Sequence, residues 1–298
     1  MATVLERIRL CLAFMIISLA IGFPAWAQTS AFFPDESTSI TSGLAPAGSV
    51  LGIFRNPAFF TPEASQIFVQ SKSDVWGYSS RSVGVLAPMS AFSLSLGYQS
   101  FSASDIIVAA KPAAGRPSIS SYTQDAYTMI QGGLGIPLTD SIAAGLKVRY
   151  LHRQLYTDQV TSFTGDLGMR MRLGAHYRVG VYTSNLLQSP LRWSSSATQE
   201  TLPIRCIVEG YYEDDLFQIG VRTTIVNVHN LMAAYRLAPT VLLYAEGLFS
   251  NRFALSQASI GTYLEVGAMF LQYTYILSGL NAEDFSQSQH TIGIGMRL

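Results

Sequence analysis

Charged side chains at alternate positions of apolar segments are the residues of this chain with the clearest chemical potential. In the segment 142–150, Lys147 and Arg149 alternate with apolar residues. Alternate side chains of a β-strand point to the same face, so both charges would share one face of a sheet. Later segments repeat the pattern. Together they give eight candidate charges for one face of that sheet: Lys147, Arg149, Asp166, Arg170, Arg172, Arg205, Glu209 and Arg222.

Six of these eight candidates are basic and two are acidic. If some stay unpaired, the excess positive charge would attract an anionic head group such as a carboxylate. The alternative is a set of arginine–carboxylate bonds that fills the interior of the protein. Both alternatives stay open, because pairing depends on the fold.

The histidines give no support to catalysis. Each falls at or near the end of a different expected strand: His152, His176, His229 and His290. A hydrolase needs a nucleophile, a base and an orienting group, and a metal site needs spaced ligands; neither pattern is present. The Gly-Gly-Leu-Gly sequence of 132–135 lies inside a strand pattern without the helix that a phosphate loop requires. We therefore expect no enzyme activity, no cofactor and no metal site.

The C-terminal segment indicates what positions these side chains. In 290–298, Ile292, Ile294, Met296 and Leu298 alternate with polar or small residues. A strand sorted in this way up to its last residue is typical of the closing strand of an outer-membrane β-barrel, with lipid on one side and the lumen on the other. A soluble sandwich would turn its apolar face inward, and one strand alone does not separate the two.

Composition favours lipid. Charged residues make up 13% of the chain, about half the share typical of soluble domains, and the mean hydropathy is +0.27. The formal net charge is zero, so nucleic acid is not an expected partner.

The N-terminus predicts export. Residues 1–27 combine a basic start, a short apolar core and the cleavage site Ala25-Trp26-Ala27, which together are typical of a signal peptide. Residues 28–63 lack alternation and are rich in Gly and Pro, which favours a periplasmic, plug-like segment. Residues 64–298 would then form the barrel, in the outer membrane.

Alternation along 64–298 predicts about fourteen strands, joined by short turns that alternate with longer linkers. A change of alternating face near Met269 predicts a bulge or kink there. The expected strands are 64–72, 79–88, 90–101, 122–136, 141–153, 162–173, 175–186, 202–212, 215–226, 229–238, 240–249, 252–262, 264–277 and 288–298. The expected long linkers are 102–121, 154–161, 187–201 and 278–287.

Three short motifs resemble one family of such barrels. The motif Asn56-Pro57-Ala58 is similar to the element that follows the N-terminal segment of FadL-like barrels, the long-chain fatty-acid transporters and the related PorV/PorQ proteins of type IX secretion. The second match, in 164–186, resembles a PorV-type hairpin with an Asp-x-Gly strand. The third is the C-terminal pair made by 271–275 and the strand that His290 opens.

The resemblance implies a function without catalysis. We expect a PorV/PorQ-type protein that docks secreted or partner proteins at the outer membrane. The alternative is a FadL-like transporter that takes up a hydrophobic small molecule through a lateral kink in the wall. A purely structural barrel is the second alternative.

The long linker 102–121 is the expected contact for a protein partner. It joins an apolar run that contains Ile106, Ile107 and Val108 to a half punctuated by Pro and Gly. An apolar segment at an aqueous rim needs a cover. Either a secreted cargo protein or secretion-system subunit covers these residues, or they fold into the barrel mouth as a constriction.

Overall fold

The computed structural model describes residues 54, 56–59, 64–74, 78–110, 118–194, 199–224, 229–249, 255–278 and 287–298. The expected signal peptide and most of the expected plug-like segment lie outside these residues. In the described part of the chain, no helix is long and apolar enough to cross a membrane.

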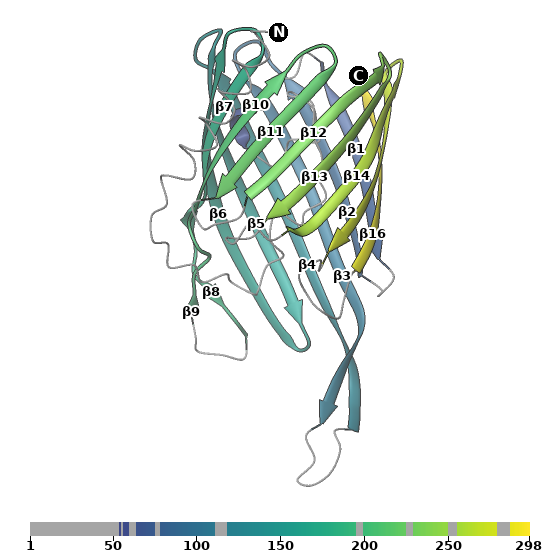
Figure 1. Ribbon diagram of the computed structural model, residues 1–298. Coiled ribbons are helices and arrows are strands. Elements are labelled where there is room, and N and C mark those ends of the chain that lie inside the picture. Colours follow the sequence, from purple (N-terminus) through teal and green to yellow (C-terminus); the bar gives the residue numbers. More distant parts are fainter. Residues whose placement is uncertain are drawn as a thin grey trace.

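The described residues form a closed antiparallel barrel of fourteen strands (Figure 1). This confirms the all-β barrel and the strand number that the alternation predicted. The strands are β1 (Gln66–Asp74), β2 (Tyr78–Pro88), β3 (Ser93–Ala110), β4 (Ser118–Pro137), β5 (Ile142–Leu155), β6 (Asp158–Leu173), β7 (Tyr177–Gln188), β10 (Arg205–Glu213), β11 (Phe217–Thr224), β12 (His229–Ala238), β13 (Val241–Phe249), β14 (Leu255–Val266), β15 (Met269–Ser278) and β16 (Gln287–Arg297).

Each strand pairs with its neighbour in sequence, and the barrel closes where β1 pairs with β16. Ile67 lies opposite Met296 in this pair, so the C-terminal alternating segment is the closing strand. One interruption separates β7 from β10, where the short strands β8 (Leu191–Arg192) and β9 (Gln199–Glu200) form a two-stranded sheet of their own.

The two ends of the barrel differ. Six tight connections, the first at 89–92 and the last at 267–268, lie at the same end as Leu298, which we call the short-turn end. The opposite end, called the long-loop end, carries the connection between β7 and β10 and the projecting hairpin of β3 and β4 (Figure 1). In an outer-membrane barrel the short turns face the periplasm.

Three expectations about connections were wrong. The linker expected at 102–121 is mostly strand, since β3 and β4 continue into one hairpin up to Ala110 and from Ser118. The linker expected at 154–161 is a two-residue turn in which Tyr156 has a φ of 57°. The bulge expected near Met269 is the turn at 267–268 between β14 and β15, with Gly267 at a φ of 61°.

Side chains on the wall separate into two faces. Outward-facing residues are apolar, and Met169 on β6 is 54% exposed in the isolated chain. Inward-facing residues are buried, and Lys147 on β5 is 1% exposed. Exposed apolar residues around a closed barrel would be covered by lipid, so the outer face provides the apolar band of a membrane barrel.

Candidate functional site: the barrel interior

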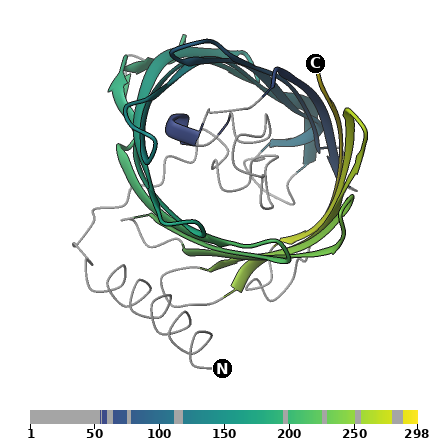
Figure 2. The same ribbon diagram turned by 90° about the horizontal axis from the view of Figure 1, so that it is seen from above.

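A short N-terminal element lies inside the barrel. The 3-10 turn η2 (Pro57–Phe59) follows Asn56 and packs against the inner side of β4, β5 and β6 (Figure 2). Asn56 and Ala58 are fully buried, and the Ala58 N–H donates a hydrogen bond of 3.0 Å to Asn56 Oδ1. This side-chain-to-backbone bond is the usual local turn of an asparagine.

Two glycines form the seat for this element. Gly145 on β5 and Gly168 on β6 lie opposite each other in the ladder, both on the inner face. A Cβ atom at Gly145 would lie 2.2 Å from the Pro57 carbonyl carbon, and one at Gly168 would lie 2.0 Å from Asn56 Oδ1. Only glycine permits so close an approach. The Asp-x-Gly motif of β6 therefore has a structural role, because its glycine receives the Asn-Pro-Ala motif.

Asn56 also connects the element to β6 and to β10, which lies beyond β7 in the wall. Its Nδ2 donates to Glu209 Oε1 on β10 at 2.8 Å and to the Met169 carbonyl at 3.3 Å. On β5, Lys147 Nζ donates to the Phe54 carbonyl at 3.3 Å. Two of the eight candidate charges therefore hold the N-terminal element in place.

Asp166 is the centre of the buried charge cluster. Its carboxylate lies 3.1 Å from Lys147 Nζ and accepts a bond of 2.7 Å from Arg149 Nη2. It also accepts a hydrogen bond of 3.0 Å from the Asn185 N–H. All three charged side chains are at least 95% buried, so each needs these partners to be tolerated. This part of the structure follows the second alternative, in which paired charges fill the interior.

The backbone bulges where Asp166 reaches β7. The ladder between β6 and β7 shifts register between Gly165 and Leu167, and Asn185 takes a φ of 59°. Asparagine is one of the few residues that adopt this left-handed conformation readily. Its side chain accepts from Arg149 Nη2 at 2.9 Å and donates to the Pro203 carbonyl at 2.9 Å. Asn185 was missed as a functional residue, although an asparagine inside a strand pattern is a signal for such a bulge.

The remaining candidate charges lie along the same inner face. Glu209 pairs in register with Arg222, which lies opposite Asn230, and Asn230 Nδ2 donates to Glu246. Arg205 is half-buried at the start of β10. Arg170 is half-buried on β6, whereas Arg172 is exposed at the short-turn end and donates to the Gly174 carbonyl at 3.2 Å.

Large apolar side chains make up much of the rest of the interior. Towards the short-turn end, Phe68 and Phe270 stack with ring centroids 6.1 Å apart, and Tyr263 stacks on Phe270 at 5.4 Å. Towards the long-loop end, further buried side chains from β4, β5, β6 and the β7–β10 connection belong to the same cluster: Tyr127, Met129, Leu151, Val160, Leu191, Trp193 and Leu202. Buried polar side chains such as Gln70, Gln131 and Gln272 share the interior, so the cluster gives an apolar solute a contact surface within a mixed lumen.

Tyrosines lie on both faces of the wall. Tyr150 and Tyr273 point outward, as residues of a membrane-interface girdle would. Tyr244 is instead buried inside, where its hydroxyl bonds to Thr274 and accepts from Gln272 Nε2 at 2.8 Å. Tyr211 also faces inward and donates to Glu209 Oε2 at 2.9 Å.

The apolar run of the β3–β4 hairpin lies away from this interior. Ile106, Ile107 and Val108 pair with β4 in the part of the hairpin that projects beyond the neighbouring strands (Figure 1). Their pairing places this backbone beyond the strands that flank the hairpin, and the role of the run, as a partner contact or a constriction, stays a prediction. Among the described residues, no three His, Cys, Asp or Glu side chains are grouped to hold a metal ion.

Comparisons with known proteins find the same architecture. One solved structure, a monoaromatic hydrocarbon channel called CymD, superposes with a TM-score of 0.62 at 11% identity and covers 86% of this chain and 95% of its own. The toluene transporter TbuX of Ralstonia pickettii gives 0.60 at 10% identity, over 86% of this chain and 98% of its own. A FadL homologue of Pseudomonas aeruginosa gives 0.56 at 9% identity, over 86% and 96%.

The chain has the FadL-type barrel fold. No family model matches the sequence, and no curated protein matches it. The FadL-like part of the resemblance thus agrees with the fold, whereas these neighbours give no support to the PorV/PorQ type.

Proposed function

We propose that this protein is a non-enzymatic outer-membrane channel for small hydrophobic molecules. This was the alternative at the level of sequence, and the docking function implied by the PorV/PorQ resemblance is now the weaker reading. The support is the cluster of large apolar side chains inside a FadL-type barrel, which offers an apolar cargo a contact surface beside the polar groups of the lumen. The neighbours described as hydrocarbon channels and a toluene transporter favour the same class of cargo.

The charges inside the barrel fit an uncharged cargo. The Asp166 carboxylate pairs with both Lys147 and Arg149, so it offsets one of the two positive charges, and it is fully buried. A partly compensated cluster attracts an anionic head group much less than six unpaired cations would. Its role in this proposal is to anchor the N-terminal element and the β7 bulge, while the cargo contacts the apolar cluster.

The wall between β7 and β10 is our candidate for the lateral kink. The last pair of this ladder joins Ser184 to Arg205, and beyond it the described residues show no further pairing between the two strands. Asn185 bridges the separation through its bond to the Pro203 carbonyl. Leu202 belongs to the buried apolar cluster, and Ile204, two residues further on, is exposed, so this stretch carries apolar side chains both in the interior and on the surface.

These two residues allow a matched test. Leu202 is 4% exposed and Ile204 is 54% exposed, and both belong to the same irregular stretch before β10. Leu202→Asn should lower uptake of a monoaromatic hydrocarbon by cells whose outer leaflet is lipopolysaccharide, whereas Ile204→Asn should have a smaller effect. Equal uptake by the wild type and by cells without the protein would refute the proposal, provided that the barrel is shown to be folded by its heat-dependent gel mobility.

One observation keeps docking as a second candidate function. Beyond the Ala103–Tyr78 and Asp125–Leu155 pairs, β3 and β4 pair only with each other among the described residues, so in this part of the chain neither edge of the hairpin has a neighbouring strand. Open edges offer backbone groups to an added chain. Replacing 106–123 by a short turn should then abolish co-purification of a secreted protein while leaving hydrocarbon uptake intact. An unchanged set of co-purifying proteins would exclude this second function.

A further inference from the structure

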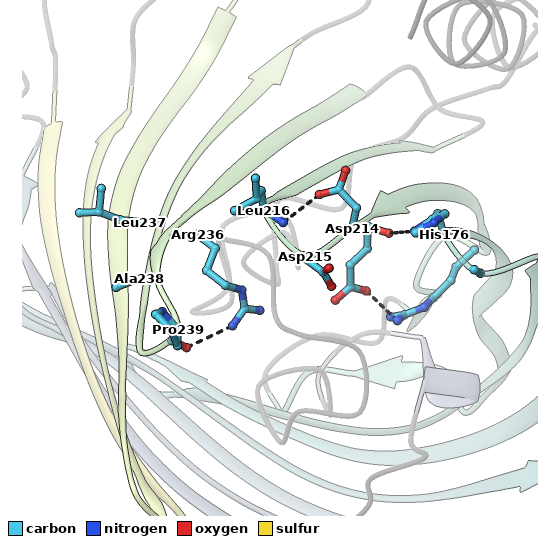
Figure 3. A pocket seen from close by; sticks show the side chains of 11 residues that line it. His176, Asp214, Asp215, Leu216, Arg236, Leu237, Ala238 and Pro239 are labelled. Carbon is cyan, nitrogen blue, oxygen red and sulfur yellow. Dashed lines mark hydrogen bonds and ion pairs between the residues drawn. The ribbon is translucent and has the colours of Figure 1, made fainter. Parts of the chain in front are cut away.

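A pocket at the short-turn end is separate from the apolar cluster of the lumen. It has a volume of about 680 Å³, within the usual range for ligand sites, and lies among three tight turns (Figure 3). The turn before β7 contributes His176, the turn before β11 contributes Asp214, Asp215 and Leu216, and the end of β12 contributes Arg236. The Arg236 N–H donates to the Leu216 carbonyl at 2.8 Å, which fixes the second turn beside the third.

Several polar groups of this pocket are already engaged. Glu213 and Arg178 form an ion pair of 2.6 Å, and the His176 Nδ1 bonds to the Glu213 carbonyl at 3.0 Å. The Asp214 carboxylate accepts hydrogen bonds from the Phe217 N–H at 2.7 Å, the Leu216 N–H at 2.9 Å and the Tyr212 hydroxyl at 2.7 Å. These groups build the walls of the pocket.

Two opposite charges remain available to a ligand. Arg236 Nη1 donates only to the Pro239 carbonyl, at 3.3 Å, which leaves most of its five N–H donors open. The exposed carboxylate of Asp215 has no hydrogen-bonding or ionic partner in the described part of the chain. In the view of Figure 3, Asp215 lies between Arg236 and His176. The pocket thus offers a cation and an anion to the same occupant.

Exposed leucines accompany these charges at the rim. Leu216 is 53% exposed and Leu237 is 62% exposed, although both line the pocket. Leu237 follows Arg236 at the register shift near the end of the β12–β13 ladder, where its side chain is exposed at the rim of the pocket. An occupant that spans this edge would place a zwitterionic group, with one positive and one negative charge, beside Arg236 and Asp215. Its apolar chains would lie against Leu237.

We propose that this pocket binds the head group of a zwitterionic phospholipid from the periplasmic leaflet. The lipid phosphate accepts hydrogen bonds from Arg236, and its ammonium group donates to Asp215, with the negative charge of Asp214 nearby. The acyl chains lie over Leu237 on the outside of the barrel. The inference relies on the outer-membrane location within the proposed function, and not on the identity of the transported molecule.

The charge balance of the pocket argues for a zwitterion and against an anionic lipid. Three carboxylates line it, whereas its permanent cations are two arginines. An anionic head group would gain Arg236 but would face Asp215 without a counter-charge, which is unfavourable.

Lipid retention tests the proposal directly. The full-length folded protein would be stripped of lipid in mild detergent and titrated with phosphatidylethanolamine or phosphatidylglycerol, and bound lipids would be counted by native mass spectrometry. The wild type should retain phosphatidylethanolamine about two- to fivefold better, the range expected for one partly exposed ion pair. Asp215→Asn should remove this preference by improving retention of phosphatidylglycerol, and Arg236→Gln should weaken retention of both lipids.

Controls separate this site from other causes. Arg81→Gln removes an exposed arginine from the outer face of β2. This residue lies towards the end of β2 that is remote from the short turns and the pocket, so the substitution should leave retention unchanged. Equal retention of the two lipids by the wild type, or unchanged retention in Asp215→Asn, would overturn the proposal. Displacement of the lipid by equimolar glycerophosphoethanolamine would also overturn it, because the site would then recognise a soluble head group. Hydrocarbon uptake should be unaffected in both pocket variants, so failure of the transport proposal would be seen separately.

Discussion

Gly145→Ala is the substitution that most directly tests how the N-terminal element is held. The new Cβ would lie 2.2 Å from the Pro57 carbonyl carbon and 2.4 Å from the Ala58 nitrogen. These are backbone atoms, so no side-chain rotation relieves the clash and the whole turn must move. A shift of about 1 Å or more is needed to reach ordinary van der Waals separation.

The expected cost follows from the contacts that such a shift would lengthen. Asn56 would lose good geometry with the Glu209 carboxylate, and a hydrogen bond to a charged group contributes about 1.5–3 kcal/mol. Overpacking adds about 1–3 kcal/mol where the site cannot relax. We expect the free energy of unfolding to fall by about 2–4 kcal/mol, since relaxation offsets part of this sum.

Denaturant unfolding in micelles, followed by tryptophan fluorescence, would measure this loss. Gly132→Ala on β4 is the matched control, because its Cβ would meet only Leu96 Cδ2 at 3.8 Å and should cost less than about 0.5 kcal/mol. Gly168→Ala allows a double-mutant cycle, because the atom nearest to its new Cβ is Asn56 Oδ1. The loss of unfolding free energy caused by Gly168→Ala should be smaller in an Asn56→Ala background. The reasoning is refuted if Gly145→Ala and Gly132→Ala unfold at the same denaturant concentration.

Three further predictions concern charges at different depths. Asp166→Asn should destabilise the barrel by about 3–5 kcal/mol, because it leaves Lys147 and Arg149 buried without their counter-ion. Joint replacement of all three residues by apolar ones should cost much less. An equal loss of stability in both variants would contradict the role of Asp166 as the counter-ion of this cluster. Met169→Arg should lower the free energy of unfolding by about 2–4 kcal/mol if the outer face lies in lipid near the bilayer midplane, as measured by refolding into lipid vesicles. An unchanged stability would mean that the inner and outer faces of the wall are assigned the wrong way round. Partial desolvation would raise the pKa of Asp214, but hydrogen bonds from the Phe217 N–H, the Tyr212 hydroxyl and the Leu216 N–H lower it below its ordinary value of 3.8. Its contribution to stability is therefore complete above pH 3.8 and is lost as the pH falls through the lowered pKa; Asp214→Asn should abolish that part of the acid dependence, and an unchanged acid transition would argue against the shift.

Alternation predicted the strands well because lipid and lumen impose opposite polarity on the two faces of a wall. It located the turns less well. Val266 and Met269 are cross-strand partners on either side of the turn at 267–268, so the outward face changes from even to odd positions there. A bulge produces the same change in sequence, which is why the turn was taken for a bulge. For the β3–β4 hairpin, the Pro and Gly residues at 112–117 indicate a loop, but the predicted linker was extended on both sides of them into residues that form strand.

The inner site was predictable in part. Alternation assigned Lys147, Arg149 and Asp166 to one face, but their pairing depends on register, and register is set by contacts far apart in sequence. The two glycines that receive Asn56, Gly145 and Gly168, lie 89 (145 − 56) and 112 (168 − 56) positions further along the chain, so no local pattern reveals the contact. Tyr244 faces inward because its hydroxyl finds buried partners, Thr274 and Gln272, that belong to another strand.

Delivery of a labelled monoaromatic hydrocarbon into cells tests the central claim most directly. The cells should have a lipopolysaccharide outer leaflet and no hydrocarbon channel of their own, and a polar solute of similar size should be measured in parallel. The apolar cluster inside the barrel predicts faster entry of the hydrocarbon when the barrel is present and no change for the polar solute. Faster entry of the polar solute alone, or no change for either with the folded barrel in the outer membrane, would contradict a channel for hydrophobic molecules.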